Sequence, residues 1–389
     1  VVCSRRRQGR GHPRPLPFIV AILSSRPYAM PEHFGARTGD DMNSRQRVLA
    51  AMNFTGPDRC PIHHYCFPGA IWRHGQKLLD LAARYPDDFG NENLTANAAA
   101  QPLAENESAE DIIEWVDGWG TTWRRMRGYT SGEVHRPALP DWDAWRTYEF
   151  PPLPDDKHFA DFAASVKPRQ EAGEFVRAGG GPFFQHMQHL RGNANYYLDL
   201  AEDNEGVNEL ADRMVAYNLY SIERYVQMGV DCIAFGDDWG AQHALLIHPD
   251  MWRRFFKPRY AKMFAPAREN GIQVWFHSDG WILEIIEDLI EIGVTLLNPQ
   301  HDIMGTRRVG EIVRGRCCIR TDISRQTVIP FGTPDDIRAA VKEALEAFST
   351  DAGGCMLHGE IGQEVPFENI EALYAAFYEY GQYPMEWRR

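Results

Sequence analysis

Short apolar runs that end in polar residues recur along the second half of the chain. The first two are Cys232–Phe235, followed by Gly-Asp-Asp, and Ile272–Phe276, followed by His-Ser-Asp-Gly. Between them, residues 249–269 have apolar side chains at helical spacing, begin with proline and are followed by Asn-Gly, a helix stop. The pattern predicts a strand, a helix and a second strand, with acids and a histidine at the carboxyl ends of both strands.

The same alternation continues to the end of the chain. Five more apolar runs have the length and composition of strands: 60–65, 175–184, 295–297, 317–319 and 355–357. Strands that alternate with helices pair in parallel through right-handed crossovers, which favours an α/β fold. We therefore predict a (β/α)8 TIM barrel, of which seven strands are assigned and the eighth is not. The alternative is a doubly wound open sheet, although its usual glycine-rich loop after the first strand is missing.

Two parts of the chain depart from this alternation. Residues 112–140 carry three tryptophans among β-formers and glycines, which predicts a hairpin excursion. Residues 1–41 begin with four arginines within the first ten positions, followed by a short apolar run and a Pro-, Gly- and Ser-rich stretch. A secretory signal, including a twin-arginine signal, is one interpretation of that stretch. We interpret it instead as a disordered or non-native, flexible extension, and place the single barrel domain at 42–389, with Ser44 as N-cap of its first helix.

Composition narrows the classes of function. The formal net charge of -13 disfavours a general nucleic-acid binder, which needs a basic face. Seven cysteines without regular spacing are not typical of a disulfide framework and fit a reducing compartment, so we expect a cytoplasmic protein. A membrane span is not expected, because the sequence has no run of 18 or more apolar residues.

Polar side chains stand at the end of each predicted strand, and a barrel would bring them to one mouth. They are His63 and His64, His186 and His189, Asp237 and Asp238, His277 and Asp279, Asn298 with Gln300 and His301, Asp322, and His358 with Glu360. Such a gathering of acids and histidines at one end of a barrel is typical of an active site.

Several segments resemble the uroporphyrinogen decarboxylase superfamily, which includes porphyrin decarboxylases and methyltransferases that demethylate corrinoid-bound methyl groups. The segments are FGDDWG (Phe235–Gly240), HSDG (His277–Gly280), LLNPQ (Leu296–Gln300), TDISRQTVIPFGTP (Thr321–Pro334) and VPFENIEALY (Val365–Tyr374). The resemblance covers nearly everything after residue 41, is most specific from Gly229 onwards, and implies a (β/α)8 barrel.

The sequence also differs from the family at two places. Porphyrin decarboxylases of the family begin with an arginine-rich element that grips substrate carboxylates, whereas residues 61–70 here read PIHHYCFPGA. Family methyltransferases bind zinc through a His-x-Cys pair and a distant cysteine. The resemblance places His277 at the first position, Asp279 at the second and about Gly359 at the third. With His358 and Glu360 beside Gly359, the resemblance implies a harder site for zinc or another divalent metal that activates water or an oxygen substrate.

These considerations select three sets of candidate residues. The candidate catalytic residues are Asp237, Asp238 and His277; the candidate metal ligands are His277, Asp279, His358 and Glu360; the candidate substrate-binding residues are His64, His186, Trp239, Gln300 and Asp322. Adjacent carboxylates after an apolar strand are costly to bury unless they are paired or used in function. Structural alternatives are an arginine partner for one aspartate, capping roles for His277 and Asp279, and packing for Trp239. At most one of His63 and His64 faces the barrel interior, because neighbours on a strand alternate faces.

Three functions remain open. The first is metal-assisted methyl transfer, linked to a corrinoid co-substrate or a corrinoid protein, or related one-carbon chemistry, with an aspartate handling protons. The second is decarboxylation of a tetrapyrrole or a smaller carboxylic acid without a metal. The third is a barrel that binds a corrinoid or tetrapyrrole without turnover. A small-molecule or tetrapyrrole substrate is expected in either enzyme, and neither nucleic acid nor membrane is an expected partner.

Overall fold

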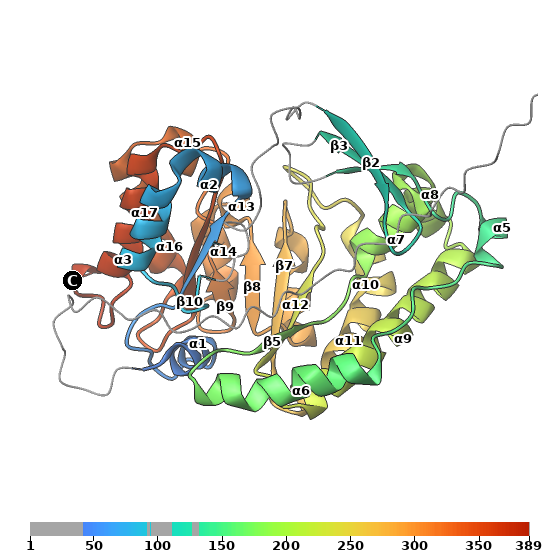
Figure 1. Ribbon diagram of the computed structural model, residues 1–389, viewed down its shortest axis with the longest axis horizontal. Coiled ribbons are helices and arrows are strands. Elements are labelled where there is room, and N and C mark those ends of the chain that lie inside the picture. The colour runs from blue at the N-terminus through green and yellow to red at the C-terminus, as the bar shows by residue number, and fades with distance from the viewer. Residues whose placement is uncertain (1–41, 92–93, 95–110, 127–131, 389) are drawn as a thin grey trace, which may run out of the picture. The chain divides into compact units, whose positions relative to one another are not determined.

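The computed structural model describes residues 42–91, 94, 111–126 and 132–388, which belong to one compact unit. Its centre is a parallel sheet of seven strands in the order β1-β10-β9-β8-β7-β6-β5 (Figure 1). The strands are β1 (Ile62–Cys66), β5 (Arg177–Gly179), β6 (Cys232–Gly236), β7 (Gln273–Ser278), β8 (Leu296–Pro299), β9 (Cys318–Arg320) and β10 (Cys355–Ile361). Because the first strand pairs with the last, the sheet curls back on itself. The order follows the chain, unlike a doubly wound sheet, whose order reverses at a switch point.

The described helices alternate with the strands along the chain, and most of them pack on the outer face of the sheet. Those before β6 are α1 (Ser44–Met52), α2 (Pro68–His74), α3 (Gln76–Arg84), α5 (Trp142–Trp145), α6 (Asp156–Glu171), α7 (Phe184–Arg191), α8 (Asn193–Ala201) and α9 (Glu205–Gln227). Those after it are α10 (Pro249–Phe255), α11 (Lys257–Glu269), η1 (Leu283–Ile285), α12 (Ile286–Ile292), α13 (His301–Met304), α14 (Thr306–Val313), α15 (Val328–Phe331), α16 (Pro334–Phe348), α17 (Phe367–Tyr380) and η2 (Glu386–Arg388). None of the described helices is long and apolar enough to cross a membrane.

The barrel prediction is confirmed in part, because an eighth strand is absent from the described residues. At the edge of β1, residues Asp87 and Asp88 supply the bonds that a neighbouring strand would supply. Asp88 Oδ2 accepts the backbone N–H of Ile62 at 2.8 Å, and Asp87 Oδ2 accepts that of His64 at 3.1 Å. The backbone N–H of Asp88 donates to the carbonyl oxygen of Ile62. Side-chain carboxylates therefore replace part of the hydrogen-bond ladder that an eighth strand would form. The segment that carries them has no strand-like pattern of apolar residues.

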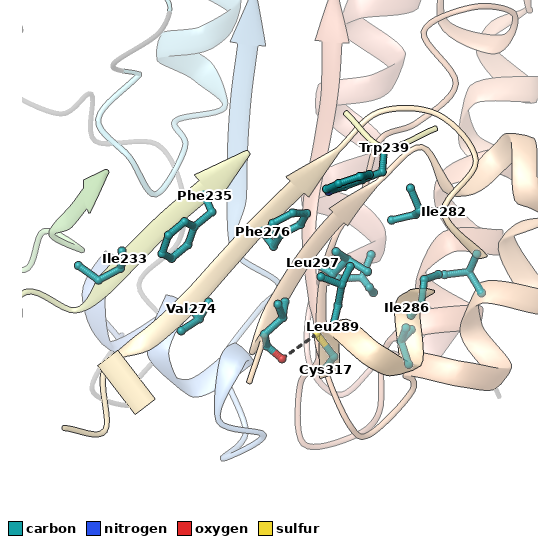
Figure 2. Close-up of a cluster of buried hydrophobic side chains, with 14 of the residues drawn as sticks. Ile233, Phe235, Trp239, Val274, Phe276, Ile282, Ile286, Leu289, Leu297 and Cys317 are labelled. Atoms are coloured by element: carbon teal, nitrogen blue, oxygen red, sulfur yellow. Dashed lines mark hydrogen bonds between the residues drawn. The ribbon is translucent and has the colours of Figure 1, made fainter. Parts of the chain in front are cut away.

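Alternation along the strands gives the core two layers. Outward side chains such as Ile233, Val274 and Phe276 pack against the helices (Figure 2). Inward side chains form a second cluster inside the curl: Cys232, Trp275, Leu296, Cys318 and Met356, joined by Phe175 and by Val48 and Met52 of α1. Helix α1 thus closes the curl from inside, at the level of the inward residues nearest the amino ends of the strands. Inward positions further along the strands reach the carboxyl ends, where the polar residues gather.

Two predictions about local structure need comment. The excursion at 112–140 is a three-stranded antiparallel sheet rather than a single hairpin, formed by β2 (Ile112–Val116), β3 (Thr122–Met126) and β4 (Glu133–Arg136), and it contacts α7 (Figure 1). The N-cap of α1 is Asn43, not Ser44, because Asn43 Oδ1 accepts the backbone N–H of Gln46, and Gln46 returns a bond to the Asn43 N–H.

Candidate metal centre at the carboxyl ends of the strands

Three side chains converge at the carboxyl ends of β6 and β7. His277 Nε2 lies 3.7 Å from Asp238 Oδ1 and 3.6 Å from Asp279 Oδ1. Their ligand atoms all lie within 4.8 Å of one another, and the three side chains are about one third exposed: 36 % for Asp238, 33 % for His277 and 30 % for Asp279. Within the described part of the chain, no other group of three His, Cys, Asp or Glu side chains converges in this way.

The ring of His277 is held from behind by Asn298 on β8. His277 Nδ1 lies 2.9 Å from Asn298 Oδ1, while Asn298 Nδ2 donates to the carbonyl oxygen of Arg320 at 3.0 Å. The amide oxygen is therefore the acceptor, and the proton is on Nδ1 of His277. Nε2 is left facing two carboxylates, a position that favours a cation.

The two carboxylates are also held in place. Asp238 Oδ1 accepts the backbone N–H of Asp279 at 2.9 Å, and Asp238 Oδ2 accepts Nε2–H of Gln185 at 2.8 Å. Asp279 Oδ2 pairs with Arg325 Nη2 at 2.6 Å, but its buried Oδ1 has no hydrogen-bond partner among the described atoms. The 3.6 Å to His277 Nε2 is too long for a hydrogen bond. Burying a carboxylate oxygen without a hydrogen-bond partner is costly unless a cation binds it. The three side chains therefore fit a divalent metal.

A second acidic group surrounds Arg325. Its Nη1 pairs with Glu360, and its Nε lies 3.9 Å from Asp322 Oδ2. Burial raises the pKa of Asp322 well above its usual range, and the charges of Glu360 and Asp279 add to this effect, while Arg325 opposes it. Tyr65, half-buried on β1, lies opposite Glu360 in the register of β1 and β10. Burial and the charge of Glu360 raise the pKa of Tyr65.

The predicted metal ligands are brought together only in part. His277 and Asp279 meet as expected, but the third member of the group is Asp238 instead of His358 or Glu360. Arg325 stands between Asp279 and Glu360 and binds both. His358 is buried, with Nδ1 2.8 Å from Arg320 Nη2 and Nε2 3.9 Å from Glu360 Oε1. His358 and Glu360 thus belong to a neighbouring network of hydrogen bonds and charges.

Asp237 does not face this group. It lies on the outer face, where its carboxylate accepts the Tyr260 hydroxyl at 2.5 Å and the backbone N–H groups of Phe184 and Gln185 at 3.1 and 2.9 Å. Burial raises its pKa to about 6, although these three bonds oppose the shift. Asp237 joins the start of α7 to α11, and the structure gives no support to its predicted catalytic role.

Four of the predicted substrate-binding residues are engaged elsewhere. His64 points outwards, with its ring 3.7 Å from that of Tyr374, and His63 is the member of the pair that faces the interior. Trp239 is fully buried in the outer cluster (Figure 2). Its ring stacks on that of Phe184, with the ring centroids 3.7 Å apart. His186 packs against Trp119, at a centroid distance of 4.1 Å. Gln300 Oε1 accepts the backbone N–H of Gly280 at 2.7 Å and so supports the loop that carries Asp279. Of this set, Asp322 alone lies beside the candidate metal centre.

Four residues of the site received no role from the sequence: Gln185, Asn298, Arg320 and Arg325. Asn298 was visible as a polar residue at a strand end, inside LLNPQ. The arginines flank Asp322 in a segment that resembles the family, and a cation within an acidic strand end is a usable signal. Gln185 has no such signal, because it reaches Asp238 from a helix 53 positions earlier in the chain.

Comparisons with known proteins agree with this fold. The sequence model of the uroporphyrinogen decarboxylase (URO-D) family matches residues 161–380, more than half of the chain. A methyltransferase from Methanosarcina mazei has the same fold, with a TM-score of 0.60 and 19 % identity over 87 % of this chain and 99 % of that one. A 3-keto-D-glucoside 4-epimerase from E. coli, at a TM-score of 0.34 and 13 % identity over 63 % of this chain and 95 % of its own, is too distant for further comparison. No curated protein sequence matches. The family match and the curled parallel sheet together show that the chain belongs to the uroporphyrinogen decarboxylase family, a family of barrel enzymes.

Proposed function

We propose that this chain is a metal-dependent enzyme that transfers a methyl group or another one-carbon unit. A divalent cation would be held by Asp238, His277 and Asp279. The observation that carries the proposal is the convergence of His277 Nε2 with two carboxylate oxygens, one of which has no other partner. The likeness to the Methanosarcina mazei protein, which is named a methyltransferase, is the reason for placing methyl transfer first.

The donor set indicates the class of metal. One imidazole nitrogen and two carboxylate oxygens suit zinc, manganese or iron better than a thiolate-rich set would. When bound, such a metal supplies a Lewis acid that polarises an oxygen-bearing substrate or a water molecule. Corrinoid as co-substrate, and a corrinoid protein as partner, rest on the family resemblance alone.

The chain's own residues would prepare the site. Asn298 holds His277 with Nε2 towards the opening, and Gln185 and the Asp279 N–H hold Asp238. Asp322 lies beside Arg325, and because burial raises its pKa it is our candidate for the group that handles protons. Asp238, the candidate for proton handling from the sequence, is here a ligand.

The charge around the site argues against decarboxylation of a tetrapyrrole with many carboxylates. Asp279, Asp322 and Glu360 lie around the guanidinium of Arg325, which already pairs with Asp279 and Glu360. A further acid, Asp238, lies beside His277. Such a mouth repels a polyanion. The arginine-rich element of the porphyrin decarboxylases is also missing from residues 61–70.

Metal binding by the purified protein tests this proposal. Protein that begins at Met42, prepared without chelator, should contain about one divalent ion per chain by elemental analysis, or take one up in calorimetry with Zn²⁺ or Mn²⁺. H277A and D238N should each weaken binding by more than about 100-fold, because the remaining ligands make a poor site.

The chain offers a matched control with the same His-x-Asp spacing. His248 and Asp250 are 72 % and 74 % exposed at the start of α10, and no third His, Cys, Asp or Glu ligand converges with them in the described part of the chain. H248A and D250N should leave metal binding unchanged. The proposal is wrong if the wild-type protein takes up none of these ions stoichiometrically, or if the control variants lose as much affinity as H277A.

A further inference from the structure

We infer that Cys60 and Cys355 form a reversible oxidation site, at which a hydroperoxide converts the two thiols into a disulfide. The site lies at the amino ends of β1 and β10, whereas the candidate metal centre lies at the carboxyl ends of the strands. The inference goes beyond the proposed function and does not depend on it.

The register of β1 and β10 places the two cysteines side by side. Ile62 pairs with Leu357, and the backbone N–H of Leu357 donates to the carbonyl oxygen of Pro61 at 2.7 Å. Cys60 lies two positions before Ile62, and Cys355 lies two positions before Leu357. Neighbouring strands are about 4.8 Å apart, a separation of Cα atoms that a disulfide can span.

Both thiols point to the same side of the sheet. Cys60 and Cys355 belong to the outer cluster, and each is 0 % exposed. Their side chains are hydrogen-bonded to each other. Cys318, on the neighbouring strand β9, belongs instead to the cluster inside the curl, so its thiol points to the other face. The side chains of Cys60 and Cys355 therefore meet on one face, as a disulfide requires.

The two cysteines differ in reactivity. Burial would raise the pKa of Cys60, but hydrogen bonds with Cys355 and Tyr383 lower it, and the net shift is downwards. The bond with Cys60, together with burial, raises the pKa of Cys355 well above its usual range. Because the thiolate reacts with a peroxide and the thiol does not, Cys60 is the sulfur that is oxidised first.

A hollow on the surface gives a small oxidant a route to the pair. The hollow has a volume of about 570 Å³ and is lined by Asp351, Tyr383, Pro384, Met385 and Arg388. The hydroxyl oxygen of Tyr383 lies 3.7 Å from Cys60 Sγ, so this side chain connects the hollow with the thiols. A movement of Tyr383 would admit hydrogen peroxide, which is the smallest hydroperoxide.

The oxidation proceeds in two balanced steps. The Cys60 thiolate attacks the O–O bond of hydrogen peroxide and becomes a sulfenic acid, while the second oxygen leaves as hydroxide and is protonated to water. The sulfur of Cys355 then attacks the Cys60 sulfur, and its proton leaves with the hydroxyl group as a second water. Two thiols are oxidised to one disulfide and one peroxide is reduced to two waters. A dithiol restores both thiols by exchange.

The bridge would tie the first strand of the sheet to the last. It would close a loop that contains most of the chain and would therefore restrict the unfolded chain more than the folded one. The melting temperature of the oxidised protein should rise by about 5 °C.

Peptide mapping and a thiol count after treatment of the folded protein with dilute hydrogen peroxide test the site. The full chain should carry C3S, because Cys3 lies outside the described residues, and the six other cysteines are all free. The count should fall from six to four, a peptide should join Cys60 to Cys355, and dithiothreitol should restore all six thiols. C60S and C355S should each keep their five thiols and should not change in melting temperature.

Cys66 supplies a matched control. It is also buried in the outer cluster, and its Sγ lies 3.4 Å from the Tyr374 hydroxyl, but its neighbour in register on β10 is Ile361. C66S should form the bridge as the C3S chain does. The inference is overturned if the C3S chain keeps all six thiols, if the linked peptide contains another cysteine, or if C60S still loses two thiols. The proposed tie between the strands is wrong if the oxidised and reduced proteins melt at the same temperature.

Discussion

Asp238 faces the inside of the curled sheet and His277, whereas Asp237 faces the helices and accepts the Tyr260 hydroxyl. His63 and His64 are divided in the same way: His63 contacts Arg320 inside, and His64 stacks on Tyr374 outside. Neighbours on a strand point to opposite faces, so the role of each residue depends on one position of register. At the residue scale, His64 is the clearest case for testing a structural role.

His64 should influence the dependence of stability on pH. Burial lowers its pKa to about 4, so the folded state resists protonation, whereas the unfolded chain takes up a proton near pH 6.5. The stability that neutral His64 contributes is complete above about pH 6.5 and is lost as the pH falls towards 4. Phenylalanine keeps the stacking and does not titrate. Urea unfolding should therefore show that wild type loses up to about 3 kcal/mol more than H64F over this range.

The same experiment has a control and a contrary outcome. H64F should keep the metal affinity of wild type, because His64 lies outside the site. Parallel pH profiles for the two proteins would mean that His64 is not held neutral in the folded state.

At the element scale, the segment before residue 91 closes the edge of β1 without forming a strand. Asp88 is 2 % exposed and accepts bonds from Arg47, Arg59 and the backbone of Ile62. Phe89 continues across the gap, with its ring 6.1 Å from that of Phe175 next to β5. One short segment thus joins the two strands that are not paired with each other.

Replacing Asp88 should destabilise this edge strongly. D88A leaves two buried or half-buried guanidinium groups and one strand N–H without their acceptor, which should lower the free energy of unfolding by about 3–5 kcal/mol. Urea unfolding measures the loss. E371A removes the exposed partner of Arg84, with side chains 57 % and 50 % exposed, and should cost less than about 1 kcal/mol. Equal losses in the two variants would show that the carboxylate of Asp88 does not stabilise this edge.

At the scale of the whole molecule, helix α1 closes the cluster inside the curled sheet. Its capping box uses Asn43 and Gln46, and its inner face places Val48 and Met52 in the cluster inside the curl. Every group that starts this helix therefore lies after residue 41.

Removal of residues 1–41 should leave the melting temperature of the protein unchanged within about 2 °C, by calorimetry. Removal of α1 as well should lower it by many degrees or prevent folding, because the inner cluster would lose its closure. A loss of several degrees on the first truncation would show that residues 1–41 stabilise the folded unit.

The sequence by itself determined the alternation of strands and helices, the family, and the set of strand ends that carry polar groups. These are recorded in local patterns: apolar period, helix caps and short motifs. The sequence also predicted that His277 and Asp279 lie together, because residues two positions apart at a strand end point to the same face.

Only the tertiary structure decided which strand ends meet. The partnership of Asp238 with His277, the separation of Glu360 by Arg325, and the contact of Gln185 with Asp238 join residues that lie 35 to 53 positions apart. The edge of β1 could not be predicted from the sequence either. There the carboxylates of Asp87 and Asp88 accept the N–H groups that the backbone of a neighbouring strand would otherwise accept. Such contacts depend on register and side-chain reach between elements, and a single sequence records neither of these.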